Sequence, residues 1–475
     1  MSDRTKTLGE RAIVLGGSVS GMCSAKVLSQ YFDEVVILER DEMPDVEGEP
    51  TFRPGVSQSR HHHVLLAKGR ENLAALFPGF DESLAENGAP LLDYARDCAL
   101  FSPIGGAPRF ESGIGIRPCR RQLVDWVIRK HLGEVSNIRW IDRARVAGLA
   151  YDASNSRVQG VRFHLGKAER FLSSELVVDA TGKNTKLPKW LSALGFNVPK
   201  EEMIDPKMGY ASRLFRPGPG FRADWRATEV SAQAPQNPRA AGLWEVEDGQ
   251  WLLTLIGING TYPPTDEEGF KEFARALPNP LVANFLEDAI PLGPIYGHRG
   301  SKTRRRNYGS MKRFPDGLVA TGDAVCSFNP IYGQGMTMAS QGAIELDSVL
   351  KKRIATKAPL RGLARTYHRR LRKVGLSAWL LATSEDFRWD GTTGGKPDLV
   401  TKLSYRYLDW LMPISPYSEE VVGAFLGIAN MVTPSYALFS PTILMQRFFH
   451  PIRQKFQPEL LASHVYREEL GGDLR

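Results

Sequence analysis

The feature that most constrains the fold of this chain is a glycine-rich turn between short apolar runs near the N-terminus. Ala12 to Leu15 has the pattern of a buried parallel strand, and Gly16 to Gly21 supplies a tight turn. The apolar spacing from Met22 to Phe32 predicts a helix lying on a sheet, and Val35 to Leu38 predicts a second strand that ends at Glu39. This strand–helix–strand unit predicts a parallel sheet with a phosphate-binding turn at the start of its helix.

The residues of this turn have distinct expected roles in a dinucleotide site. Gly16 permits the tight turn, and Gly21 permits close packing of the helix on the strand. Glu39 has the position of an acid that accepts hydrogen bonds from ribose hydroxyls. The pattern departs from G-x-G-x-x-G because Ser18, preceded by Gly17, replaces the middle glycine. The alternative is a glycine-rich turn without a ligand, and the position of Glu39 and a second motif argue against it.

The second motif lies far along the chain and begins with an expected buried strand from Gly317 to Ala320. Asp323 follows at the strand end, where a carboxylate can accept a hydrogen bond from a ribityl hydroxyl. A helix is expected over Met336 to Leu350, after a loop whose backbone is left bare by Pro330, Gly333 and Gly335. Such a loop can present N–H groups to the electron-rich edge of a flavin. An ordinary strand–loop–helix joint is the alternative, and FAD is the ligand that the two motifs fit best.

A third segment, Leu176 to Gly182, places Asp-Ala-Thr-Gly at the end of a strand. With these three segments the chain resembles the FAD-dependent monooxygenase superfamily typified by para-hydroxybenzoate hydroxylase. Within that superfamily it is most similar to the bacterial epoxidases of polyether biosynthesis, such as those of monensin and lasalocid. That closer resemblance rests on the segments Arg53 to His63, Cys119 to Trp126 and Tyr210 to Arg216.

The resemblance implies roles for further residues. Arg121, at the start of an expected helix, would contact the FAD phosphates or the flavin edge. The segment that contains Arg60, His61 and His63 would lie near the flavin ring, without a certain catalytic role because the flavin carries the chemistry. A metal site is not expected there, since three adjacent histidines cannot all point one way. The full set of candidate cofactor-binding residues is Gly16, Gly17, Ser18, Gly21, Glu39, Arg40, Gln58, Arg121, Asp323, Pro330, Gly333, Gly335 and Met336.

The implied activity is that of a monooxygenase, which inserts one oxygen atom from O2 into a hydrophobic natural-product precursor by epoxidation or hydroxylation. In this superfamily reduced FAD and O2 form a flavin C4a-hydroperoxide with an electrophilic distal oxygen, so the protein supplies orientation and a dry cavity. The electrons come from NAD(P)H, directly or through a separate flavin reductase. A separate reductase agrees with the segment Asp179 to Thr185, which lacks the second glycine and the arginine of D-G-x-x-S-x-x-R, and direct use of NAD(P)H stays open.

Three alternatives remain beside the monooxygenase. The first is a flavin-dependent reductase of the geranylgeranyl-reductase type, which shares the nucleotide fold. The second is a flavin-dependent halogenase, although the Trp-x-Trp-x-Ile-Pro signature of tryptophan halogenases is absent and Trp244 and Trp251 have the pattern of hairpin residues. A non-enzymatic flavoprotein is the least favoured.

Composition and charge bear on the compartment and the partners. The cysteines Cys23, Cys98, Cys119 and Cys326 are scattered, which suits a reducing cytoplasm, and the polar N-terminus does not suggest a signal peptide. The net charge is +8, but no nucleic-acid motif is visible, so a nucleic-acid partner is not expected. The densest basic cluster, residues 302–313, is interpreted as a solvated face or as a docking patch for a reductase or a membrane.

The predicted fold class is α/β, with α+β character overall. A Rossmann-like FAD-binding domain would span residues 1–190, with an excursion near 86–109, and resume at 300–350. A substrate domain with an antiparallel sheet would be inserted at 191–299, and residues 351–475 would form a helical extension. Its aromatic residues would pack on the enzyme, line an apolar pocket, or make a peripheral membrane contact around Arg447, Phe448, Phe449, Arg453 and Lys455.

Overall fold

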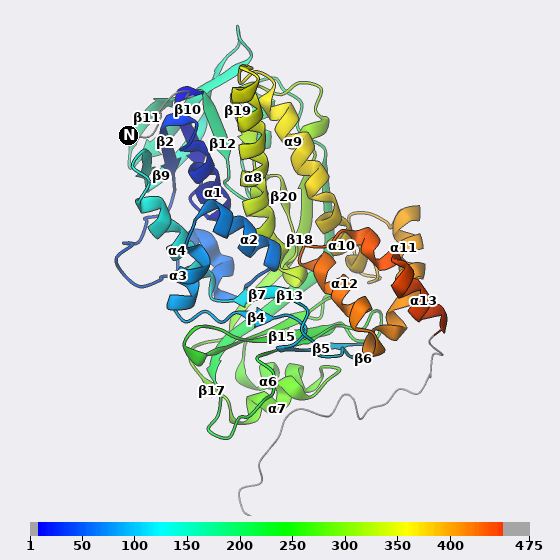
Figure 1. The fold of residues 1–475 in the computed structure, drawn as a ribbon. Helices are drawn as coiled ribbons and strands as arrows, with labels where there is room; N and C mark the ends of the chain where they lie inside the picture. The colour runs from blue at the N-terminus through cyan, green and yellow to red at the C-terminus, as the bar shows by residue number, and fades with distance from the viewer. Residues whose placement is uncertain (1–7, 450–475) are drawn as a thin grey trace, which may run out of the picture.

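The parallel sheet forms the centre of the first domain in the computed structural model, which describes residues 8–449 (Figure 1). Its strand order is β19-β12-β1-β2-β8, and the strands are β1 (Gly9–Leu15), β2 (Phe32–Leu38), β8 (Ile138–Ile141), β12 (Leu176–Asp179) and β19 (Leu318–Ala320). All four pairings between neighbouring strands of this sheet are parallel. Ala12–Leu15 of β1, Val35–Leu38 of β2 and Leu176–Val178 of β12 are apolar and buried, as expected for the middle of a parallel sheet that is covered on both faces.

Two helices that begin at the two sequence motifs pack beside each other on this sheet. They are α1 (Val19–Leu28) and α8 (Gln334–Ala355), shown in blue and yellow-green in Figure 1. The expectation of a helix from Met22 to Phe32 was wrong at its end, because α1 stops at Leu28 and Phe32 is the first residue of β2. Tyr31 is buried in the turn between them, where its hydroxyl donates to Asp347 of α8.

The remaining elements of this domain surround the parallel sheet. An antiparallel sheet of β9 (Ala144–Asp152), β10 (Arg157–Leu165) and β11 (Ala168–Ser173) connects β8 to β12. A small sheet in the order β3-β7-β4 contains β3 (Val64–Leu65), β4 (Leu92–Asp93) and β7 (Gly115–Pro118). The other helices are α2 (Ala67–Leu76), α3 (Phe80–Glu86), α4 (Arg121–Gly133) and α5 (Leu187–Ala193).

The second domain is built on a large mixed sheet in the order β20-β18-β13-β16-β15-β14-β5-β6, with β17 beside β13. Its strands are β5 (Cys98–Ser102), β6 (Gly105–Gly106), β13 (Glu201–Arg216), β14 (Ala227–Val230), β15 (Arg239–Glu245), β16 (Trp251–Gly257), β17 (Ile290–Pro291), β18 (Tyr296–Arg306) and β20 (Cys326–Ser327). The helices α6 (Glu267–Arg275) and α7 (Leu281–Asp288) cover one face of it, where Phe270, Val282 and Leu253 share a core. The strand β18 crosses the boundary expected at residue 300, because its pairing with β13 continues to Arg306.

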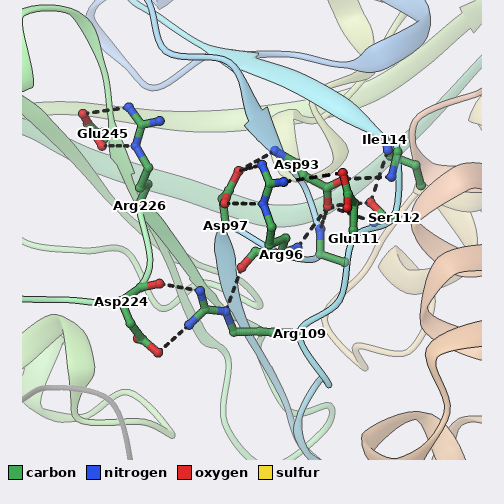
Figure 2. A network of polar contacts seen from close by, with 12 residues as sticks. Asp93, Arg96, Asp97, Arg109, Glu111, Ser112, Ile114, Asp224, Arg226 and Glu245 are labelled. Carbon is green, nitrogen blue, oxygen red and sulfur yellow. Dashed lines mark hydrogen bonds and ion pairs between the residues drawn. The ribbon is translucent and has the colours of Figure 1, made fainter.

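Two strands of the excursion near residues 86–109, β5 and β6, belong to this second sheet, whereas β4 pairs with β7 in the small sheet. Strand β5 pairs in parallel with β14, and the loops around it are held by charged side chains (Figure 2). The Asp93 carboxylate accepts hydrogen bonds from the hydroxyl of Ser112 at 2.8 Å and from the backbone of Gly113 at 2.7 Å. Arg109 forms an ion pair of 2.8 Å with Asp224, so the excursion is tied to the substrate domain.

The C-terminal region is helical, as Figure 1 shows in yellow to red. Its helices are α9 (Leu363–Val374), α10 (Leu376–Asp386), α11 (Leu399–Leu411), α12 (Glu419–Ala429) and α13 (Pro441–Phe449). Gly375 separates α9 from α10. Within residues 8–449, no helix is long and apolar enough to cross a membrane. Arg453 and Lys455, named for a membrane contact, lie outside the described residues. The architecture as a whole confirms the predicted fold class.

Candidate functional site

A cavity of about 620 Å³ lies between the parallel sheet, the mixed sheet and the N-terminal ends of α1 and α8. Its volume is in the usual range of small-molecule and cofactor sites. Both sequence motifs reach it, although they lie far apart in the chain. The candidate residues that line the cavity are Ser18, Arg40, Gln58, His61, His63, Arg121, Asp323, Pro330, Gly333, Gly335 and Met336.

Three other candidates, Gly16, Gly21 and Glu39, do not line the cavity but determine the conformation of the glycine-rich turn. Gly16 has a φ of +95°, and a Cβ there would lie 2.7 Å from the carbonyl oxygen of Ala180, which directly follows β12. A Cβ on Gly21 would lie only 1.8 Å from the carbonyl oxygen of Gly16. Both positions therefore need glycine, one for its backbone angle and one for the close approach of α1 to the turn.

Glu39 lies at the end of β2 and is 7 % exposed. Its carboxylate accepts hydrogen bonds from the backbone N–H of Gly17 at 2.7 Å and of Asp41 at 3.0 Å. Arg53 completes this corner, because its guanidinium donates to the carbonyl of Gly17 at 3.0 Å and lies 3.7 Å from Glu39. Arg53 was not among the candidate residues, although its segment carried the family resemblance. Its long reach across the turn has no local sequence signal.

Arg121 opens α4 and points at the glycine-rich turn. Its guanidinium donates to the hydroxyl of Ser18 at 2.9 Å and, through two nitrogens, to Asp125 one helical turn later. The side chain is buried, so its fork of donors is fixed in place by its neighbours. A cation held at the N-terminal end of α1 suits an anionic pyrophosphate. Arg40, by contrast, is mostly exposed, at the rim.

The three adjacent histidines point to three different partners. His61 shares a hydrogen bond of 2.9 Å with Ser212, and the ring of His62 stacks on that of Trp244. The Nδ1–H of His63 donates a hydrogen bond of 3.0 Å to the backbone carbonyl of His61. Burial lowers the pKa of His61 and of His63 to about 3 and that of His62 to about 4. All three rings are therefore neutral at physiological pH. Within residues 8–449, no three His, Cys, Asp or Glu side chains are grouped so that they could hold a metal ion.

Arg60 does not line the cavity. Its guanidinium lies over the rings of Phe52 and Tyr296, 4.1 Å and 4.4 Å from their centroids. These two cation–π contacts hold the segment that leads into the histidines.

The mixed sheet lines the cavity with Tyr210, Thr254, Ile256 and His298, none of which was a candidate site residue. Thr254 and Ser212 are opposite each other on β16 and β13, and their hydroxyls are 2.7 Å apart. The next row on the same face contains Ile256, Tyr210 and His298, and the rings of the latter two stack at 5.1 Å. The alternating pattern of the strands predicted two faces but not which one the cavity would meet.

The segment from Asp323 to Met336 forms the opposite wall. Burial raises the pKa of Asp323, and nearby Arg121 and Lys183 oppose that shift. A Cβ on Gly335, at the start of α8, would meet no atom within 4 Å, so bare backbone faces the cavity. The hydroxyl of Ser20 on α1 is buried and finds no hydrogen-bond partner within residues 8–449. The cavity thus offers a set of donors and acceptors that fits FAD. This set consists of the N-termini of α1 and α8, the guanidinium of Arg121, the carboxyl of Asp323 and the unpaired hydroxyl of Ser20.

The basic cluster at residues 302–313 is largely paired with acids of β13. Lys302 lies 2.9 Å from Asp205. Arg305 lies 2.6 Å from Glu202, and Arg304 and Arg306 lie 3.6 Å and 3.0 Å from Glu201. The cluster thus forms cross-strand ion pairs between β18 and β13 rather than a uniformly unpaired patch.

Comparisons with known proteins agree with this architecture. The chain is 32% identical over 465 residues to "Protein Rv3254" of Mycobacterium tuberculosis (strain ATCC 25618 / H37Rv), an alignment that covers 95% of this chain and 96% of the relative. No protein-family model matches the sequence. Among solved structures, it superposes on the flavin-dependent brominase Bmp2 with a TM-score of 0.65 and 14% identity, covering 93% of this chain and 100% of the other. It also superposes on PqsL, a probable FAD-dependent monooxygenase from Pseudomonas aeruginosa, with a TM-score of 0.61 and 14% identity, covering 80% and 97%.

Proposed function

The chain belongs to the same family as Protein Rv3254 of Mycobacterium tuberculosis and has the fold of FAD-binding monooxygenases, and from this premise we propose that it is an FAD-dependent monooxygenase. Its reaction would insert one oxygen atom from O2 into a hydrophobic natural-product precursor, as an epoxidation or a hydroxylation. The observation that carries the proposal is the meeting of two distant motifs, Ser18 to Ser20 and Asp323 to Met336, on one cavity.

The cofactor-binding half of the cavity supports FAD through specific groups. The N-terminal end of α1, with Ser18 and Arg121, would hold the pyrophosphate. Glu39 would accept hydrogen bonds from the ribose, exchanging its present contact with Gly17 for a ligand hydroxyl. Asp323 would accept from the ribityl chain, and the backbone at Gly335 would face the flavin. Bound FAD, once reduced, would supply the activation of O2.

The substrate half of the cavity supports an uncharged reaction partner. Apolar side chains from both domains line it, namely Val64, Met203, Ile256, Phe328, Met336 and Ala339. His61 is held against Ser212 and Tyr210 and is neutral, so it would position ligands by hydrogen bonding and shape rather than by charge. Apolar side chains at this wall would limit the access of water to the reaction, which suits oxygen transfer to an alkene or arene.

The electron source is part of the proposal. NAD(P)H would reduce the flavin either directly or through a separate flavin reductase, and the departure of Asp179 to Thr185 from the D-G-x-x-S-x-x-R pattern favours the second route. In the structure the Asp179 carboxylate is fully buried and accepts a hydrogen bond of 2.6 Å from the hydroxyl of Thr181. The Asp179 carboxylate thus accepts hydrogen bonds from the turn that directly follows β12. A cytoplasmic location agrees with the four free cysteines.

Two measurements test the proposal. The purified chain should bind FAD and become yellow, and a titration of the apo-protein followed by flavin fluorescence gives the affinity. The FAD-loaded protein, reduced and mixed with candidate polyenes and terpenoids under labelled O2, should yield a product that gains one heavy oxygen atom by mass spectrometry. A colourless protein that ignores FAD would refute the cofactor. Products that gain hydrogen instead of oxygen would favour the reductase alternative, and bromide-dependent bromination would favour the halogenase.

A further inference from the structure

A buried polar cluster joins the C-terminal helical region to the cavity wall. Asp386 is the last residue of α10, Thr303 lies on β18, and Asn329 lies in the loop that precedes α8. The amide nitrogen of the Asn329 side chain donates to both oxygens of the Asp386 carboxyl, at 2.7 Å and 2.9 Å. The Thr303 hydroxyl donates to Asp386 at 3.4 Å and accepts from the backbone N–H of Asn329 at 3.2 Å.

The carboxyl in this cluster is costly for a purely structural role. Asp386 is 3 % exposed, and burial raises its pKa to about 8. Its hydrogen-bond partners are the neutral groups of Thr303 and Asn329, and the nearby charges that act on it, Glu385 and Asp205, are acidic. A buried carboxyl without a cation destabilises a fold, whereas an apolar side chain would pack there at no such cost. Stabilisation of the fold by packing therefore does not explain the presence of Asp386 in this cluster.

The effect of Asp386 that does explain it is the orientation of the Asn329 side-chain amide. Asn329 is 3 % exposed and lines the cavity. Because its nitrogen is turned to Asp386, its oxygen Oδ1 is turned away, and this atom is buried without a partner within residues 8–449. An amide oxygen that is buried and unpaired normally costs free energy until it accepts a hydrogen bond. The position of the residue between Asp323 and Gly333 places that oxygen in the segment that we assign to FAD.

We propose that Asn329 Oδ1 accepts a hydrogen bond from an N–H or O–H group of FAD, and that Asp386, with Thr303, is the positioning residue that holds the amide in this orientation. The inference rests on the proposed function for the identity of the cofactor. It assigns a task to α10, which lies in a region outside both sequence motifs. The C-terminal extension then contributes to the cofactor site indirectly, because Asp386 holds a residue that contacts the ligand.

The test is a titration of each apo-protein with FAD, followed by flavin fluorescence. Asn329→Ala should weaken FAD binding about tenfold, which corresponds to the loss of one hydrogen bond to a buried acceptor. Asp386→Ala should weaken it to a similar extent although Asp386 does not reach the ligand. Asp386→Asn, which keeps an acceptor for the Asn329 nitrogen, should restore most of the affinity. Asp409→Asn, which removes an acidic partner of Arg388 at 3.0 Å on α11 and leaves the cluster intact, serves as the matched control with wild-type affinity.

A double variant separates positioning from general damage. If Asp386 acts through Asn329, the Asn329→Ala/Asp386→Ala protein should bind FAD no more weakly than Asn329→Ala alone. The double variant also leaves no unpaired polar side chain at the two positions, so it serves if a single variant does not fold. Wild-type affinity in Asn329→Ala, or additive losses in the double variant, would overturn the inference while FAD binding by the wild type keeps the proposed function. Failure of the wild type to bind FAD would overturn both.

Discussion

Arg121 donates a hydrogen bond of 2.9 Å to the hydroxyl of Ser18, which joins the first turn of α4 to the glycine-rich turn before α1. The same guanidinium is held by Asp125 through two nitrogens. The serine that departs from the usual glycine fingerprint is thus the residue that the arginine contacts. A hydroxyl at this position gives the cation a fixed place beside the helix N-terminus, where a phosphate would bind.

Replacing Arg121 should therefore weaken cofactor binding more than it weakens the fold. Arg121→Gln keeps a donor for Ser18 but removes the charge and the fork, so FAD affinity should fall by tenfold or more, in line with a charge-assisted hydrogen bond of about 1.5–3 kcal/mol. Lys130→Gln, at the exposed end of the same helix, should bind FAD as the wild type does. Fluorescence titration measures both, and equal affinities for the two variants would remove Arg121 from the site.

Gly21→Ala should destabilise the protein severely. The new Cβ would lie 1.8 Å from the carbonyl oxygen of Gly16, so α1 must move away from the turn, at a cost of about 3 kcal/mol or more. The matched control is Gly133→Ala at the end of α4, where a Cβ meets nothing within 4 Å and no left-handed backbone is required. Thermal unfolding followed by circular dichroism should show a large fall in Tm for the first variant only.

Asp323→Asn should move stability and cofactor binding in opposite directions. Burial raises the pKa of Asp323, so its ionised form is disfavoured in the folded apo-protein, and the neutral amide should raise the free energy of unfolding. The amide is a weaker acceptor for a ribityl hydroxyl, so FAD affinity should fall about tenfold. Urea unfolding of the apo-protein and FAD titration provide the two values. A loss in both, or a gain in both, contradicts the assigned role.

The stability of the protein should fall in mild acid because of buried neutral histidines. Burial lowers the pKa of His368 to about 3, and its ring accepts a hydrogen bond of 3.0 Å from the backbone of Ala320. In the unfolded chain this histidine binds a proton below its ordinary pKa of about 6.5, whereas the folded ring stays neutral, so stability is lost as pH falls from there. At pH 5 the loss from one such residue is about 2 kcal/mol.

His368→Gln should flatten this acid dependence. The amide oxygen can still accept from Ala320, and glutamine does not titrate. His61, His62 and His63 add to the same slope, so the variant should retain part of it. Free energies of unfolding in urea at pH 7 and pH 5 compare the two proteins. An unchanged difference between the two pH values would show that His368 is charged in the folded state.

Local patterns were enough to locate the parallel-sheet half of the molecule. The apolar run Ala12 to Leu15, the glycine turn and Glu39 predicted a strand, a turn and an acid that the structure places at one corner. The predicted end of α1 was wrong because Tyr31 and Phe32 are buried outside the helix. Tyr31 lies in the turn after α1, and Phe32 is the first residue of β2. Apolar spacing reports burial, and it cannot say where one element ends and the next begins.

The hydrogen-bond and ring partners of the polar side chains could not be predicted from local sequence patterns. The histidine segment was expected near the flavin, but the separate contacts of His61 with Ser212 and of His62 with Trp244 depend on the register of β13, β15 and β16. Arg60 was a candidate for the same region, and the structure uses it to hold Phe52 and Tyr296 instead.

The sequence by itself determined the parallel-sheet unit and the two glycine-containing segments, because backbone angles, helix starts and apolar periodicity are local properties of a chain. Only the tertiary structure decided that Asp386 meets Asn329, and that Tyr210 and His298 share the cavity face of a sheet. Those contacts join residues far apart in the sequence. They arise from strand register and helix packing, which many weak interactions fix together and no short motif records.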